Sequence, residues 1–161
     1  MGGAIALDYA RLFPERLAGL GLIGTSARLR VAPAILDGIR TDFAATTAQM
    51  MGWMVGSAFP ANARRLALQR LRESNPDVLH GDFAACDAFD LRTEVQGLPI
   101  PAIIIVGEED QMTPPKFSES LHASLPNSEL HRLPNAGHMV QLEQPDRVTD
   151  LLARFVEEQN K

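Results

Sequence analysis

The pattern of apolar and polar positions predicts a chain that alternates between helices and short strands. Residues 1–13 are apolar on nearly every side, which indicates a buried helix ending before Pro14. Three further segments have the length and apolar character of strands, at residues 20–24, 102–106 and 129–133. The middle one has five consecutive apolar residues, as is typical of a central strand buried on both faces.

Helical patterns separate and follow the last two strands, at residues 115–125 and 145–158. Strands joined through a helix pair in parallel, because the connection must return the chain to the same edge of the sheet. The fold class expected from this order is α/β, with parallel strands and flanking helices.

The middle of the chain has a different character. Residues 29–90 contain no convincing strand, and their helical segments are interrupted by prolines, with Asn62 and Asn75 placed as helix N-caps. We expect three parts: a first core segment at 1–28, a helical cap or lid at 29–90, and a C-terminal core at 91–161. The apolar side chains of the lid form either a small helical core or the wall of an apolar cavity, and both can hold at once.

Charge and cysteine content narrow the possible functions. Fifteen Lys and Arg against twenty Asp and Glu give a net charge of −5, which argues against nucleic-acid binding. Cys86 is the single cysteine, so an internal disulfide is excluded and a reducing compartment fits. No apolar run is long enough for a membrane span and no basic leader is visible, so we expect a soluble, cytoplasmic protein.

Two loops carry the candidate chemistry, because reactive groups in parallel sheets gather beyond the carboxyl ends of the strands. Asp110 follows the strand at 102–106, and His138 follows the strand at 129–133. Each residue taken singly also has a structural explanation. Asp110 could cap a turn or a helix, and the His138 ring could be hydrogen-bonded to a carbonyl. Together they suggest a carboxylate that fixes the tautomer of an imidazole base.

These residues resemble motifs of the α/β-hydrolase family. Met1-Gly2-Gly3 and the helix behind it resemble the end of that family's nucleophile elbow, Gly-x-Ser-Met-Gly-Gly. Residues 107–110 resemble its acid loop, and Gly137-His138 with Glu143-Gln144-Pro145 resembles its histidine loop. The resemblance implies a Ser-His-Asp mechanism in which Asp110 orients His138, the backbone of Met1 lies in the oxyanion hole, and no metal or cofactor takes part.

The family pattern places the serine one residue before Met1, so this sequence contains no nucleophile at that position. Ser26 and Cys86 do not lie on an elbow, and structural roles are favoured for both. The strands that precede the elbow are absent too, which leaves one edge of the strand at 20–24 open. We expect one of three explanations. The chain is truncated, its start is assigned too late, or it is completed by self-association or by a partner chain that supplies the missing strands.

Two hypotheses for the function remain. The first is a hydrolase of a carboxylic ester or related acyl substrate, inactive alone, of the esterase, peroxidase-like or carbon-carbon bond hydrolase type; dehalogenases fit less well. Its substrate would contact the side chains of Met50, Trp53, Met54 and Met139. The second is a non-catalytic protein that binds a small apolar ligand, or a partner chain along its open sheet edge.

Overall fold

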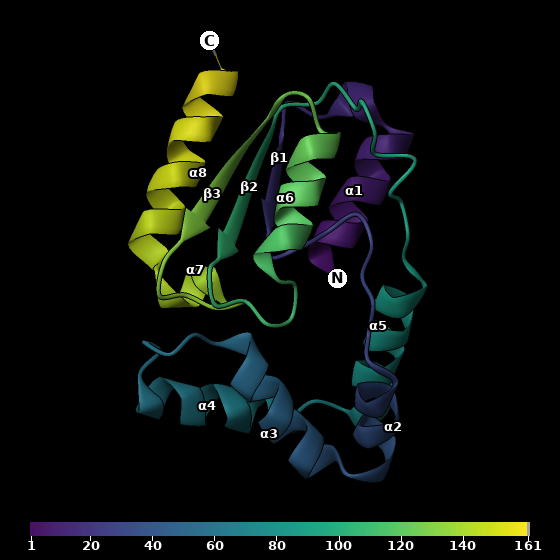
Figure 1. Ribbon diagram of the computed structural model, residues 1–161, viewed down its shortest axis with the longest axis vertical. Helices are drawn as coiled ribbons and strands as arrows, with labels where there is room; N and C mark the ends of the chain where they lie inside the picture. The colour runs from purple at the N-terminus through teal and green to yellow at the C-terminus, as the bar shows by residue number, and fades with distance from the viewer. Residues whose placement is uncertain (161) are drawn as a thin grey trace.

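A three-stranded parallel sheet forms the centre of the computed structural model, which describes residues 1–160 (Figure 1). Its strands are β1 (Leu20–Ile23), β2 (Ala102–Gly107) and β3 (Ser128–Leu133), in the order β1-β2-β3. Leu22 is in register with Ile104, which in turn is in register with Leu130. The parallel α/β fold expected from the sequence is confirmed, and the strand boundaries agree to within one residue.

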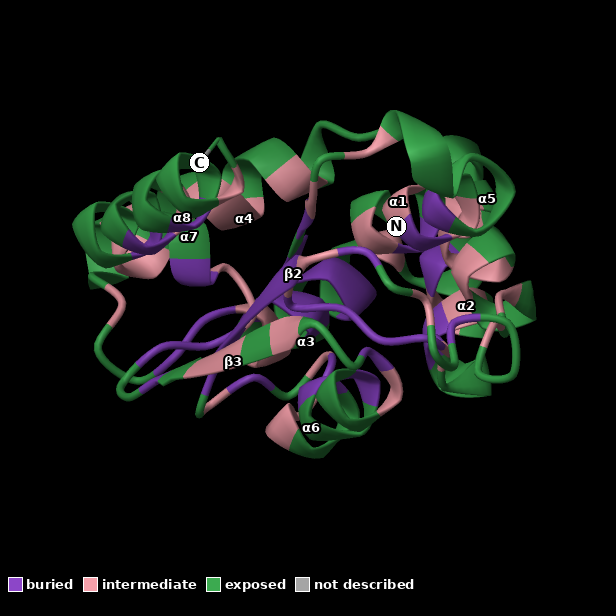
Figure 2. Cartoon of the chain, turned by 90° about the horizontal axis from the view of Figure 1, so that it is seen from above, coloured by how far each residue is buried: buried purple, intermediate pink, exposed green. Residues whose placement is uncertain are grey.

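The central strand separates two apolar clusters, one on each face of the sheet. Every residue of β2 is buried, whereas the residues of β3 before Leu133 are half-buried or exposed (Figure 2). Ala102 and Ile104 pack with α1 (Gly2–Leu12) and α6 (Pro115–Ser124), and Ile103 and Ile105 pack with α8 (Pro145–Gln159). Because alternate strand residues point to opposite faces, one continuous apolar run serves both layers.

Four helices form a separate layer beyond the carboxyl ends of the strands (Figure 1). They are α2 (Pro33–Thr41), α3 (Phe43–Met54), α4 (Ala61–Arg72) and α5 (Pro76–Ala88). Their own small core is built around Ile35, Ile39 and Met50. An isolated antiparallel bridge between Arg28 and Asp90 joins the two ends of this helical segment.

The two predicted asparagine caps have different outcomes. The side chain of Asn75 accepts hydrogen bonds from the backbone N–H groups of Asp77 and Val78, so the predicted cap is confirmed. The prediction for Asn62 is wrong, because α4 begins at Ala61 with Pro60 as its N-cap. The ring of Pro60 sets φ at −57°, and its carbonyl accepts the N–H of Arg64, so the helix starts without a capping side chain.

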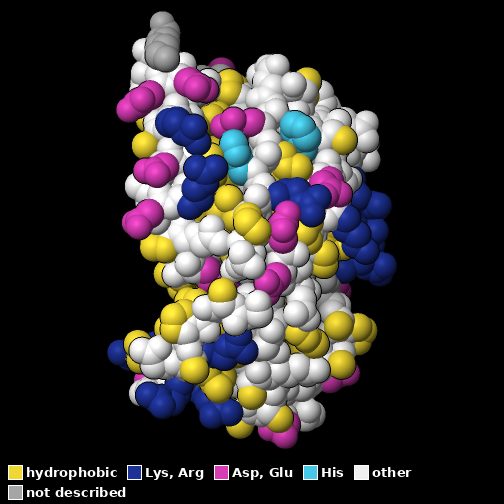
Figure 3. Space-filling model, turned by 60° about the vertical axis from the view of Figure 1, so that its left-hand side comes forward, with side chains coloured by type: hydrophobic (Ala, Val, Ile, Leu, Met, Phe, Trp, Pro, Cys, Tyr) yellow, Lys and Arg dark blue, Asp and Glu magenta, His cyan; other side chains and the backbone are white. Residues whose placement is uncertain are grey.

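Two short helices complete the chain, a 3-10 turn at Pro14–Arg16 and α7 (Val140–Glu143). Within residues 1–160, β1 pairs with β2 alone, and nearby α1 leaves Ile5 63% and Leu12 50% exposed. Acidic and basic side chains are interspersed over the face seen in Figure 3. None of the helices described has the length and apolar character needed to cross a bilayer.

Candidate active site

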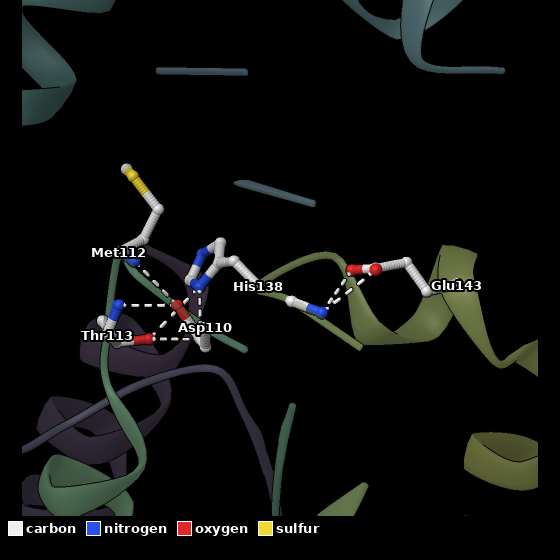
Figure 4. A network of polar contacts seen from close by, with 6 residues as sticks. Asp110, Met112, Thr113, His138 and Glu143 are labelled. Atoms are coloured by element: carbon white, nitrogen blue, oxygen red, sulfur yellow. Dashed lines mark hydrogen bonds and ion pairs between the residues drawn. The ribbon is translucent and has the colours of Figure 1, made fainter. Parts of the chain in front are cut away.

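Asp110 and His138 meet at the carboxyl edge of the sheet. Asp110 lies in the loop after β2, and His138 lies in the loop after the neighbouring strand β3. Oδ2 of Asp110 is 2.9 Å from Nδ1 of His138 (Figure 4). The Asp110 side chain is fully buried and the His138 side chain is 25% exposed, so the pair has a closed end and an accessible end.

The buried carboxylate of Asp110 has a complete set of hydrogen-bond donors. The backbone N–H groups of Met112 and Thr113 each donate to Oδ1 at 2.8 Å. The Thr113 hydroxyl donates to Oδ2 at 2.9 Å, beside the contact from His138. A buried carboxylate is costly unless it is paired in this way, and these donors fix its orientation toward the imidazole.

This arrangement selects one tautomer of the imidazole. An acceptor at Nδ1 favours the proton on that nitrogen, which leaves the lone pair on Nε2. Oγ1 of Thr113 lies 3.2 Å from Nδ1 and so contacts both members of the pair. No side chain among residues 1–160 is hydrogen-bonded to Nε2, so this atom is available to take a proton.

His138 forms part of the wall of a pocket of about 650 Å³. Met1, Met50 and Trp53 also line it, as do the apolar side chains of Ile35, Leu79, Phe83, Met112 and Phe117. Met54 and Met139 are not among its lining residues. They are instead joined to each other, because the backbone N–H of Met139 donates to the carbonyl of Met54 at 2.9 Å.

The sequence analysis missed Thr113, whose hydroxyl contacts the His138 ring, and Gly24, whose backbone leaves no room for a side chain beside it. Gly24 has φ of +53°, and a Cβ at this position would lie 3.1 Å from the imidazole. A glycine directly after a strand was the available signal for a close approach of backbone to a side chain. For Thr113, the signal was its spacing three residues after Asp110, which is the spacing of a side-chain cap.

Glu109, next to Asp110, is held by a different part of the chain. Its carboxylate accepts the backbone N–H of Ser57 at 2.6 Å and the Ser57 hydroxyl at 3.0 Å. The backbone hydrogen bond from Ser57 is the main reason that the pKa of Glu109 lies below its ordinary value. The loop that carries Asp110 is thus tied to the helical layer.

The pocket wall offers few side chains that could act as a nucleophile. Its hydroxyl and thiol groups belong to Thr25, Thr113 and Cys86, and no serine of the described chain lines it. The hydroxyl of Ser26 is engaged elsewhere, because it accepts a hydrogen bond from the backbone N–H of Arg28 at 3.4 Å. Residues 1–160 also contain no cluster of three His, Cys, Asp or Glu side chains arranged to hold a metal ion.

Comparison with known proteins matches the chain to one family over most of its length. The profile of the alpha/beta hydrolase family matches residues 1–151. The pimeloyl-[acyl-carrier protein] methyl ester esterase of Neisseria meningitidis serogroup A is 27% identical over 171 aligned positions, which cover 98% of this chain.

Among solved structures, a thermophilic esterase superposes with a TM-score of 0.89 at 35% identity and covers 98% of this chain. The enol-lactonase of Burkholderia xenovorans LB400 superposes with a TM-score of 0.85 over 98% of the chain; at 23% identity, it shows a shared fold alone. The chain spans 55% of the length of the meningococcal esterase and 63% of each of these two structures.

Proposed function

The chain belongs to the α/β hydrolase family, and from this we propose that it carries the acid and the base of an esterase that works by a Ser-His-Asp mechanism. The single observation that carries the proposal is the 2.9 Å contact between buried Asp110 and the accessible ring of His138. A carboxylate, an imidazole and an apolar pocket beyond the carboxyl ends of parallel strands are the parts that acyl transfer needs.

In the proposed reaction, Nε2 of His138 takes the proton of a serine hydroxyl as its oxygen attacks the ester carbonyl. Asp110 stabilises the imidazolium that forms, since its carboxylate faces Nδ1. His138 then gives the proton to the leaving alcohol oxygen, which leaves an acyl-serine. Water attacks this ester with His138 again as base, and the products are the carboxylic acid, the alcohol and the free serine.

We further propose that the serine precedes Met1 directly in the polypeptide that makes up the active enzyme. Met1 lines the pocket that His138 also lines, so a residue attached to its nitrogen would begin at the pocket. A peptide bond to that residue would make the Met1 nitrogen an amide N–H. This N–H is the donor proposed for the oxyanion hole. Residues 1–161 alone would then lack both the nucleophile and this donor, and would not hydrolyse an ester.

The lining of the pocket supports a substrate with an apolar part. Met50 and Trp53 of α3 lie on the pocket wall, which supports the proposal that residues 29–90 act as a lid over it. A small or medium carboxylic ester, or a related acyl compound, fits such a wall. We place the reaction in the cytoplasm, where the lone thiol of Cys86 would stay reduced.

The test compares residues 1–161 with a longer chain that includes the polypeptide encoded in frame before Met1. We expect that sequence to end in Gly-x-Ser, and the longer chain to hydrolyse a chromogenic ester such as p-nitrophenyl butyrate. The 161-residue chain, and the longer chain with that serine changed to alanine, should release nitrophenol at the rate of buffer. An upstream sequence without the serine, or equal hydrolysis by the alanine variant, would contradict the proposal.

A second candidate function rests on the open edge of β1. The helix α1 packs against β1, and its side chains Ile5, Tyr9 and Leu12 line a groove of about 350 Å³ together with Met1 and Phe89. An exposed strand edge flanked by an apolar helix face favours association with another polypeptide. On this proposal the chain binds a partner, or a second copy of itself, and has no catalytic role.

Light scattering during gel filtration separates this second candidate from the first. If the edge binds a second copy, the 161-residue chain should elute as a dimer, and Ile5→Lys should convert it to a monomer. Val156→Lys is the matched control, since Val156 is 55% exposed on α8, on the opposite face of the sheet. A monomer at all concentrations would contradict self-association.

A further inference from the structure

The connection between α3 and α4 is bonded to both loops of the candidate active site. We call its residues Met54–Ser57 the brace. The carbonyl of Met54 accepts the N–H of Met139 at 2.9 Å, and the N–H of Ser57 donates to Glu109 at 2.6 Å. Met139 follows His138 and Glu109 precedes Asp110, so one short segment holds a neighbour of each residue of the pair.

Glu143 links the brace to the other side of His138. Its carboxylate accepts the N–H of Gly56 at 2.7 Å and the N–H of Gly137 at 2.9 Å. Gly137 directly precedes His138, and Figure 4 shows His138 between the side chains of Asp110 and Glu143. Hydrogen bonds to an ionised acceptor are about twice as strong as those between neutral groups.

The backbones of the brace and of the histidine loop also touch. A Cβ on Gly56 would lie 2.9 Å from the nitrogen of Gly137, and a Cβ on Gly137 would lie 2.5 Å from the nitrogen of Gly56. Such close packing requires glycine at both positions. The one carboxylate of Glu143 therefore bonds two amides that are held side by side, and neither loop can shift without breaking one of these contacts.

The brace also fixes one wall of the pocket. It begins at the last residue of α3, the helix whose Met50 and Trp53 line the pocket. The carbonyl of Gly56 accepts a further hydrogen bond from Arg64 of α4 at 3.1 Å, so both helices beside the brace are tied to it. The position of the pocket wall is thereby coupled to the position of the imidazole.

We propose that Glu143 is a positioning residue for His138, acting through the amides of Gly137 and Gly56 so that the imidazole stays aligned with Asp110 and with the pocket wall. Its catalytic consequence rests on the proposed function. The contacts of Glu143 do not depend on the proposed function, because they are present in the chain whether or not it hydrolyses an ester. The two claims can therefore be tested apart.

The test uses nuclear magnetic resonance on the 161-residue chain and its Glu143→Gln variant. Glutamine keeps the size of the side chain but brings an NH2 group toward two N–H donors and removes the charge. Amide hydrogen exchange at Gly56 and Gly137 should become faster by on the order of tenfold or more. The Nδ1–H proton of His138, held by Asp110 in the parent chain, should shift or broaden beyond detection.

Glu157→Gln is the matched control, since Glu157 is exposed on α8, and it should leave both readouts unchanged. Faster exchange at the two glycines with an unchanged His138 proton would overturn the positioning role and leave Glu143 a structural residue. If Glu143→Gln fails to fold, Glu143→Asp takes its place, since it keeps the charge but shortens the side chain that accepts the amides of Gly56 and Gly137. Exchange at the two glycines should again be faster and the His138 proton should shift, and an unchanged proton would overturn the proposal.

In the longer, active chain, Glu143→Gln should lower kcat by on the order of tenfold and leave KM for a short chromogenic ester nearly unchanged, because a misaligned base affects the transition state. A rise in KM alone would contradict the positioning role. If the longer chain has no activity at all, the proposed function fails, while the resonance results still decide the role of Glu143.

Discussion

Replacing His138 by alanine in the longer chain is expected to lower kcat/KM for a chromogenic ester by on the order of 10⁶. Without the imidazole, the group proposed to take the serine proton and return it to the leaving alcohol is lost. The contact from Asp110 then has no ring to orient, so two of the three catalytic roles disappear with one substitution. Initial rates against ester concentration measure the loss.

His122→Ala is the control for this substitution. His122 lies on α6, is exposed, and contacts the Ser128 hydroxyl at 2.8 Å, away from the pocket lining. Its replacement should change kcat/KM by less than about twofold. Activity in His138→Ala within tenfold of the parent would show that His138 is not the base.

The largest expected effect on stability comes from Gly107→Ala. Gly107 is the last residue of β2, and a Cβ there would collide with the backbone carbonyl oxygens of Ala136 and Gly137. Backbone atoms cannot rotate away as the end of a side chain can, so the acid loop and the histidine loop must move apart. We expect a loss of roughly 3 kcal/mol or more in the free energy of unfolding, measured by urea denaturation.

A second glycine serves as the control for Gly107→Ala, and its replacement is expected to change the free energy of unfolding in the opposite direction. Gly52 lies inside α3, and a Cβ at this position would meet no atom within 4 Å. Gly52→Ala should raise the free energy of unfolding by about 0.5–1 kcal/mol, because alanine loses less backbone entropy in a helix. Similar small effects from both variants would mean that the two loops are not packed as tightly as the structure shows.

The sheet was predictable because its signal is local. The apolar run at β2 and its flanking Pro101 and Gly107 identify a central strand without knowledge of its neighbours. The same holds for Asn75, whose side chain bonds N–H groups only two and three residues away. The cap predicted at Asn62 was misplaced by two residues, because the helix begins after Pro60, whose ring sets the backbone angle of the N-cap.

The site was predictable only in part, since its partners are distant in sequence. Composition drew attention to the methionines, and Met50 lines the pocket, whereas Met54 bonds Met139 through the backbone. A hydrogen bond between backbone atoms leaves no trace in residue type. The brace is hidden for a second reason, because the carboxylate of Glu143 accepts the N–H of Gly56, which lies 87 residues away in the sequence.

By itself, the sequence determined the three strands, their parallel pairing and the two loops that contain Asp110 and His138. Each of these follows from apolar periodicity, from residues with restricted backbone angles, or from a motif within a few positions. Only the tertiary structure decided which atoms meet: the 2.9 Å contact of the pair, the Thr113 hydroxyl beside it and the packing of Gly56 on Gly137. Those depend on how whole layers pack, and packing is set by the sum of many contacts rather than by any one stretch of residues.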